Sequence, residues 1–217
     1  MAFAGYSKEA LQFLKELKAN NKKEWFDANR KTYERELRDP TKELAADLAD
    51  AVEQLTGDAQ KTKIFRINRD VRFSKDKTPY NSHVHLSVMP VDLGDQPPAW
   101  MFGWAPDYLT IGCGVFEYSG AALDGFRTMI AGNGGETFAQ ALNSLRDGGA
   151  RISEPALKRV PSGFPTDHPR ADLLKHKGIA VWHDLSGPQA ALQADIVGQT
   201  IEGFRDLLPV YEQLKKV

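Results

Sequence analysis

The fold class is decided by residues 82–89, which read Ser82-His83-Val84-His85-Leu86-Ser87-Val88-Met89. Val84, Leu86 and Val88 fall on one face of an extended chain, because successive side chains of a strand point to opposite sides. The two histidines and the serine between the apolar residues fall on the other face. This period of two predicts a strand with one buried face and one polar face, and the polar face is where chemistry is expected.

Further strands are expected on both sides of this one. Residues 63–67 read as a strand that residues 71–73 continue, and residues 99–104 and 107–116 read as two more. Short links between consecutive strands suit antiparallel pairing, since parallel neighbours need a long crossover. The sequence therefore predicts an antiparallel sheet of about four or five strands in the middle of the chain.

Helical patterns flank the predicted sheet. Residues 7–56 carry apolar side chains at spacings of three and four, and Gly57 is suited to end a helix. Residues 119–217 are again mainly helical, apart from a late strand near residues 179–183. We therefore predict an α+β fold, formed by residues 1–217 as a single globular domain, in which N-terminal and C-terminal helices pack on the sheet.

Composition narrows the class of protein. The chain has 217 residues and a formal net charge of −1, so it has no overall electrostatic attraction to nucleic acid or to an anionic membrane. Its single cysteine, Cys113, excludes an internal disulfide and a multi-cysteine zinc site. No apolar run reaches the roughly 18 residues of a membrane helix, and the N-terminus lacks a secretory pattern. We expect a soluble, cytoplasmic protein without a membrane partner.

The basic segment from Arg66 to His85 is the best candidate for a functional site. With five basic and two acidic residues it carries +3, although the whole chain carries −1. Arginine offers planar, forked donors that suit phosphate and carboxylate groups. The segment therefore predicts a pocket for a small anionic molecule, with these ligand-binding candidates: Arg66, Arg69, Arg72, Lys77 and Tyr80.

A structural role explains the same residues. Asp70 and Asp76 are close in sequence to the arginines and lysines, and they can pair with them beside a turn at residues 78–80. In that case the charges stabilise the segment and bind nothing. Both interpretations stay open at this point.

The same segment carries a resemblance to a known family. Its motif reads Phe65-Arg66-Ile67-x-Arg69-Asp70-Val71-Arg72-Phe73-Ser74-Lys75-Asp76-Lys77-Thr78-Pro79-Tyr80, and it follows an upstream pattern of Asn20-Asn21, Trp25-Phe26 and Arg30-x-x-Tyr33. Together they resemble the microbial family catalogued as domain of unknown function 2461, over nearly the whole chain. The resemblance implies a compact α+β domain and marks motif positions without assigning them a role: Arg66, Arg69, Asp70, Arg72, Asp76, Lys77 and Tyr80.

Few residues are suited to proton transfer or metal binding. Asp70, Asp76 and His83 are the acid or base candidates of the basic segment. His83 and His85 have the spacing of two metal ligands on one strand face, but two ligands do not make a site. We expect no bound transition metal and no cofactor, and we expect Cys113 to be a buried thiol rather than a nucleophile.

Three functions follow from these observations. The first is an enzyme that acts on a small phosphate- or carboxylate-bearing substrate through an arginine-rich pocket. The second is a non-catalytic module that binds an anion, a nucleotide or nucleic acid through the same residues, and the third is a structural or assembly role. Nucleic acid is the less favoured partner, because its binding usually needs a broad basic face.

Overall fold

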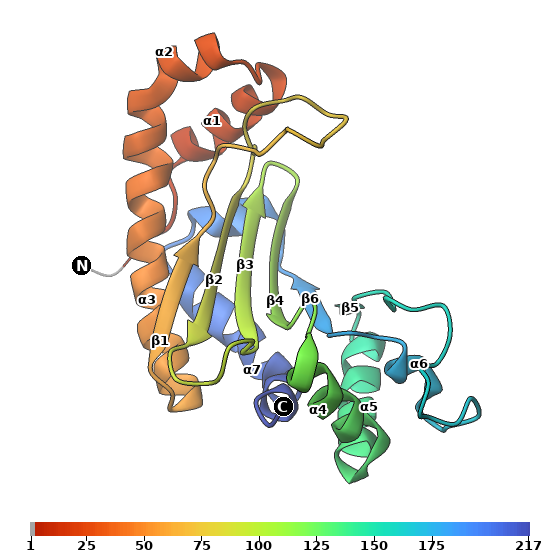
Figure 1. The fold of residues 1–217 in the computed structure, drawn as a ribbon. Helices are drawn as coiled ribbons and strands as arrows, with labels where there is room; N and C mark the ends of the chain where they lie inside the picture. The colour runs from red at the N-terminus through yellow and green to blue at the C-terminus, as the bar shows by residue number, and fades with distance from the viewer. Residues whose placement is uncertain (1–2) are drawn as a thin grey trace. The chain divides into compact units, whose positions relative to one another are not determined.

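The computed structural model of the protein describes residues 3–217, so Met1 and Ala2 of the N-terminal stretch lie outside it (Figure 1). It confirms the α+β class and the antiparallel sheet. The helical elements are α1 (Lys8–Ala19), α2 (Lys23–Tyr33), the π-helical turn η1 (Glu34–Arg38), α3 (Asp39–Thr56), α4 (Gly120–Ala131), α5 (Asn133–Asp147), α6 (Ala171–Leu174), the 3₁₀ turn η2 (Pro188–Leu192) and α7 (Ile196–Leu214). The strands are β1 (Gln60–Ile64), β2 (Val84–Pro90), β3 (Ala99–Ala105), β4 (Tyr108–Gly114), β5 (Arg151–Ile152) and β6 (Ala180–Asp184).

The sheet has six strands in the order β1-β2-β3-β4-β6-β5, one or two more than the sequence predicts. The additional strand is β5, whose two residues pair with Trp182 and Val181 of β6 and are too few to show a period. The first strand starts at Gln60 and ends at Ile64, earlier than predicted, and residues 71–73 form part of a loop instead of continuing it.

The described residues group into two compact units that alternate along the chain. The first contains the chain up to Val88, with residues 101–111 and 184–202. The second contains residues 89–100, 112–183 and 203–217. The prediction of a single domain stays a prediction.

The N-terminal helices of the first unit follow the apolar spacing in the sequence. The hydroxyl of Ser7 accepts a hydrogen bond from the Ala10 amide at 3.0 Å and so caps α1. On α3, Leu44, Leu48 and Val52 recur every four residues and are all fully buried. The helix α3 lies alongside β1 in Figure 1, and the two elements are in contact.

The strands of the first unit have the predicted two faces. Val84, Leu86 and Val88 of β2 are buried, and Phe102, Trp104, Leu109 and Ile111 of β3 and β4 join them in the core. His85 and Tyr108 point to the opposite face and remain half-buried. The sheet therefore has one covered face and one face on which polar side chains are accessible.

In the second unit, an arginine closes the end of a helix. The Nε of Arg170 donates to the Ile130 carbonyl at 2.6 Å, and its Nη2 donates to the carbonyls of Ala131 at 3.0 Å and Gly132 at 3.1 Å. These are carbonyls at the C-terminus of α4, which have no partner inside the helix. A cation at this end also opposes the helix dipole.

Candidate functional site

The basic loop, residues 66–81, folds back on itself as a hairpin-like arm between β1 and β2. The Arg69 amide donates to the Pro79 carbonyl at 2.9 Å, and the Asn81 amide donates to the Ile67 carbonyl at 2.7 Å. Asn68 and Tyr80 form an isolated antiparallel bridge between them. These backbone bonds order the two ends of the loop. The tip of the loop is held mainly by hydrogen bonds of its own side chains.

Tyr80 anchors the basic loop to the N-terminal helices. It is 6% exposed, and its ring stacks on Phe26 with the centroids 4.2 Å apart. The side chain of Asn21 donates to the Tyr80 carbonyl at 2.8 Å and accepts from the Tyr80 amide at 3.0 Å. The two parts of the chain that carry the family resemblance therefore pack against each other, and the position of Tyr80 is that of a core residue.

Arg69 is bound within the loop. Its Nη1 donates to Asp76 Oδ2 at 2.6 Å and to the carbonyl and hydroxyl oxygens of Thr78, with the carbonyl at 3.0 Å. Asp76 in turn accepts from the Thr78 amide at 2.9 Å. This amide, followed by the Arg69 guanidinium, holds the pKa of the Asp76 carboxyl below its usual range.

Arg72 and Lys77 are also engaged inside the loop, but at its surface. The guanidinium of Arg72 donates to both carboxylate oxygens of Asp70, from Nε to Oδ1 at 2.9 Å and from Nη2 to Oδ2 at 2.6 Å. These hydrogen bonds lower the pKa of Asp70. Lys77 donates to the Val71 carbonyl at 2.9 Å. The other two basic residues of the loop, Arg66 and Lys75, have exposed side chains, and neither forms an ion pair in the described structure.

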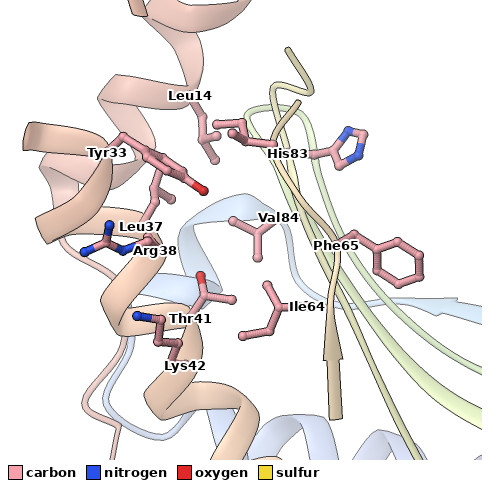
Figure 2. A pocket seen from close by; sticks show the side chains of 11 residues that line it. Leu14, Tyr33, Leu37, Arg38, Thr41, Lys42, Ile64, Phe65, His83 and Val84 are labelled. Atoms are coloured by element: carbon pink, nitrogen blue, oxygen red, sulfur yellow. The ribbon is translucent and has the colours of Figure 1, made fainter. Parts of the chain in front are cut away.

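A pocket of about 150 Å³ lies beside the loop rather than within it (Figure 2). Its lining residues come from the N-terminal helical elements, from the ends of β1 and β2 with the residues next to them, and from one apolar residue of the loop, Ile67. They are Leu14, Tyr33, Leu37, Arg38, Thr41, Lys42, Ile64, Phe65, Ile67, His83 and Val84. Of the residues nominated from the sequence, only His83 is among them. Arg66, Arg69 and Arg72 do not line this pocket.

On the other side of the strands lies a group of four rings and one lysine, all partly or fully exposed, which we call the histidine face: Lys63, Phe65, His83, His85 and Tyr108. Figure 2 shows the rings of Phe65 and His83 directed away from the pocket. The two imidazoles stack with their centroids 3.8 Å apart, and His85 Nε2 is 2.8 Å from the Tyr108 hydroxyl. The ammonium of Lys63 lies 4.9 Å from the centroid of the Phe65 ring.

A glycine gives His85 the room to reach across the sheet. A Cβ atom on Gly103 would lie 3.1 Å from Cδ2 of the His85 ring and 3.2 Å from a methyl of Thr110. Only the lack of a side chain on β3 therefore lets an imidazole from β2 cross over to a phenol on β4 without crowding. The sequence analysis indicated neither Gly103 nor Tyr108, although it predicted the strands that carry them.

Burial favours the neutral form of both imidazoles of the histidine face. It lowers the pKa of His83, and the charge of Arg69 lowers this pKa further. Burial, and then the neighbouring His83, lower the pKa of His85 to about 4. A neutral imidazole keeps one nitrogen as an acceptor, which is the form that a general base requires.

No metal cluster is found in residues 3–217, in the sense of three or more His, Cys, Asp or Glu side chains that could share an ion. Because the rings of His83 and His85 stack face to face, their in-plane nitrogens run side by side and do not converge on one ion. The expected absence of a bound metal stays a prediction for the purified protein. Cys113 is buried, and burial raises its thiol pKa well above the usual range, which disfavours a nucleophilic thiolate.

The architecture is thus an antiparallel sheet with helices and a basic loop between its first two strands. A family model described as "conserved hypothetical protein (DUF2461)" matches residues 9–212, so the chain belongs to this family, as its motif predicts. A search of curated proteins finds no match. Within the described part of the chain, no helix has the length and apolar character needed to span a bilayer.

Proposed function

We propose that the protein binds a small phosphate-bearing molecule where the basic loop meets the histidine face. The observation that carries this proposal is that His83, whose ring is stacked on His85, follows shortly after the end of the basic loop, in which Arg69 is the most sheltered arginine. Fixed cationic donors next to neutral imidazoles supply charge and directed hydrogen bonds to the same ligand.

The ion pairs inside the loop are compatible with this proposal. The side chains of Arg72 and Asp70 are 76% and 43% exposed, and ion pairs at that exposure contribute only about 0–1 kcal/mol to stability. A phosphate can therefore replace Asp70 as the partner of Arg72 at little cost. Arg66, Lys75 and Lys63 add positive charge, and the exposed ring of Phe65 offers a surface on which a planar group can stack. This combination favours a nucleotide among small phosphates.

Catalysis is a second candidate, and the histidine face favours it. His83 is half-buried, and burial lowers its pKa and so favours the neutral form that a general base requires. His85 is bonded to Tyr108 and fixes the orientation of the stack. Asp70 and Asp76 are weaker candidates, because their lowered pKa values and their hydrogen bonds oppose proton uptake. We also retain a cytoplasmic location as part of the proposal.

A thermal-shift screen of nucleotides, sugar phosphates and carboxylates tests the binding proposal. A ligand that binds the folded protein raises its melting temperature by mass action. We expect a phosphate-bearing compound at millimolar concentration to do so, and we expect Arg66→Ala and His83→Ala to reduce the shift. Arg35→Ala is the matched control, because Arg35 is an exposed arginine of the first unit that pairs with Glu9 and Glu36.

Two results would count against binding. One is that no anion shifts the melting temperature beyond a potassium chloride control. The other is that Arg69→Ala and Arg72→Ala lower the stability while every ligand leaves all variants unchanged, which supports a structural role for the loop. If binding is found, turnover of the bound compound by wild type but not by His83→Ala distinguishes the enzyme from the binding module.

A further inference from the structure

We infer that the pocket between the N-terminal helices and the first two strands is a second binding site, for a small uncharged molecule with an apolar body and one oxygen. This inference does not depend on the proposed function. Phe65 and His83 belong to the lining of the pocket, but Figure 2 shows their rings directed away from it, toward the histidine face. Its volume of about 150 Å³ is that of an apolar cavity that takes up a benzene-sized molecule.

The interior of the pocket is apolar. Its lining includes five aliphatic side chains: Leu14, Leu37, Ile64, Ile67 and Val84. The one hydroxyl of Thr41 is already 2.8 Å from the hydroxyl of Tyr6 and is not needed by a ligand. An apolar cavity of this kind gains little from water, so an apolar group is the better occupant.

Besides Thr41, Tyr33 brings a hydroxyl to the lining of the pocket. Figure 2 shows the Tyr33 phenol directed between Leu14 and Val84, toward the strands. Its ring is held by Phe26 at 5.3 Å and by Phe13 at 6.1 Å between centroids, so the position of the hydroxyl is fixed. Burial raises the pKa of Tyr33, which keeps the phenol protonated and able to donate. A ligand oxygen gives it an acceptor.

The charge at the rim indicates that the ligand is neutral. Arg38 and Lys42 are the cations of the lining, and Figure 2 shows their nitrogens on the outer side, away from Ile64 and Val84. Arg38 pairs with Glu34 at 2.8 Å and with Asp39 at 3.0 Å, and Lys42 pairs with Asp39 at 2.9 Å. Two cations are balanced by two carboxylates, so nothing at the rim attracts a carboxylate ligand.

The backbone that forms one wall has an unusual geometry. Residues Glu34–Arg38 make a π-helical turn, in which the amide of Asp39 bonds to the carbonyl of Glu34 five residues earlier. Such a turn interrupts a helix and is found frequently at functional sites. Here it carries Leu37 and Arg38 into the lining and follows directly after Tyr33.

The inference is tested with two ligands that differ by one hydroxyl and with two forms of the protein that also differ by one hydroxyl. Toluene and benzyl alcohol are titrated into wild type and Tyr33→Phe, and binding is followed by the methyl NMR signals of Leu14, Ile64 and Val84. We expect both to bind wild type, with benzyl alcohol about three- to tenfold tighter, as one hydrogen bond allows. In Tyr33→Phe this preference should disappear while toluene binding is kept.

The control is Tyr108→Phe, which removes a hydroxyl from the histidine face and should leave both affinities unchanged. The inference is overturned if neither compound shifts the pocket methyl signals, or if Tyr33→Phe leaves the preference intact. Tighter binding of benzoate than of benzyl alcohol would also overturn it, because the rim would then select a charge. Tyr33→Phe changes no carbon atom, and a melting curve close to that of wild type confirms that the variant is folded.

Discussion

His83 and His85 differ from exposed histidines in the protonation state that their surroundings impose. The folded-state pKa of His85 is about 4, below the value of about 6.5 that an unfolded chain gives. Above pH of about 6.5 neither state holds a proton on this ring, and folding is not affected. As the pH falls from about 6.5 to about 4, His85 takes up a proton in the unfolded chain but not in the folded protein, so the free energy of unfolding declines.

This decline of stability with falling pH gives a testable prediction. Wild type should lose more stability between pH 7 and pH 5 than His85→Gln, which keeps a polar side chain but removes the titrating ring. Urea unfolding at both pH values measures the difference. The carboxylates, including Asp39 with a pKa of about 2, are the same in both proteins and cancel. Equal losses in the two proteins would show that His85 is not protected from protonation.

The alternation of residues 82–89 is the reason why the apolar face of β2 could be predicted. Val84, Leu86 and Val88 are buried where the period of two places them, but Ser87, which was predicted on the polar face, is buried as well. The pairing of Arg69 with Asp76, and of Arg72 with Asp70, was one of two alternatives because these residues are neighbours in sequence. The stacking of Tyr80 on Phe26 joins residues far apart in the chain, and no local pattern predicts such a contact.

At the scale of elements, the amide of Asn21 should control the order of the basic loop. Asn21→Asp replaces the amide group that donates to the Tyr80 carbonyl with a carboxylate oxygen. Two acceptors repel each other, so the Tyr80 carbonyl loses its side-chain donor. We expect a loss of about 1–3 kcal/mol and faster hydrogen exchange at the amides of Arg69 and Asn81.

The neighbouring Asn20→Asp is the control for this prediction. Asn20 also donates through its side chain, to the Glu16 carbonyl at 3.0 Å, but at an exposed position where water can replace the bond. A change there should cost less and should not affect exchange in the basic loop. Equal effects of the two variants would mean that the bond to Tyr80 has no special role.

The C-terminus of α4 offers a second prediction at this scale. Arg170→Ala removes the donors to the carbonyls of Ile130, Ala131 and Gly132 and should lower the free energy of unfolding by about 2–3 kcal/mol. Arg146→Ala is a suitable control, because the side chain of Arg146 bonds only to the exposed Asn143 at 3.3 Å in the described structure. Denaturant unfolding compares the two, and equal stability would contradict the capping role.

For the whole molecule, the fold class was predictable because the period of the apolar residues changes from helical to two and back. The two-residue strand β5 was not, since its length shows no period. The pocket beside the loop was not predictable either. Leu14, Leu37 and Val84 belong to three different elements, and only the packing of the first unit brings them around one space. Arg170 was missed for the same reason, because its carbonyl partners lie about 40 residues earlier in the chain.

The last prediction concerns metal content. Tight zinc binding needs three or four converging ligands, and the only ligand-like pair, His83 and His85, has its rings stacked side by side. The Nε2 of His85 is bonded to Tyr108, and no third His, Cys, Asp or Glu completes a site within residues 3–217. Protein purified without a histidine tag should therefore carry far less than one equivalent of zinc, iron or manganese after gel filtration, as measured by elemental analysis. About one equivalent that is lost in both His83→Ala and His85→Ala would contradict this, because the two rings would then have to separate and turn toward a shared ion.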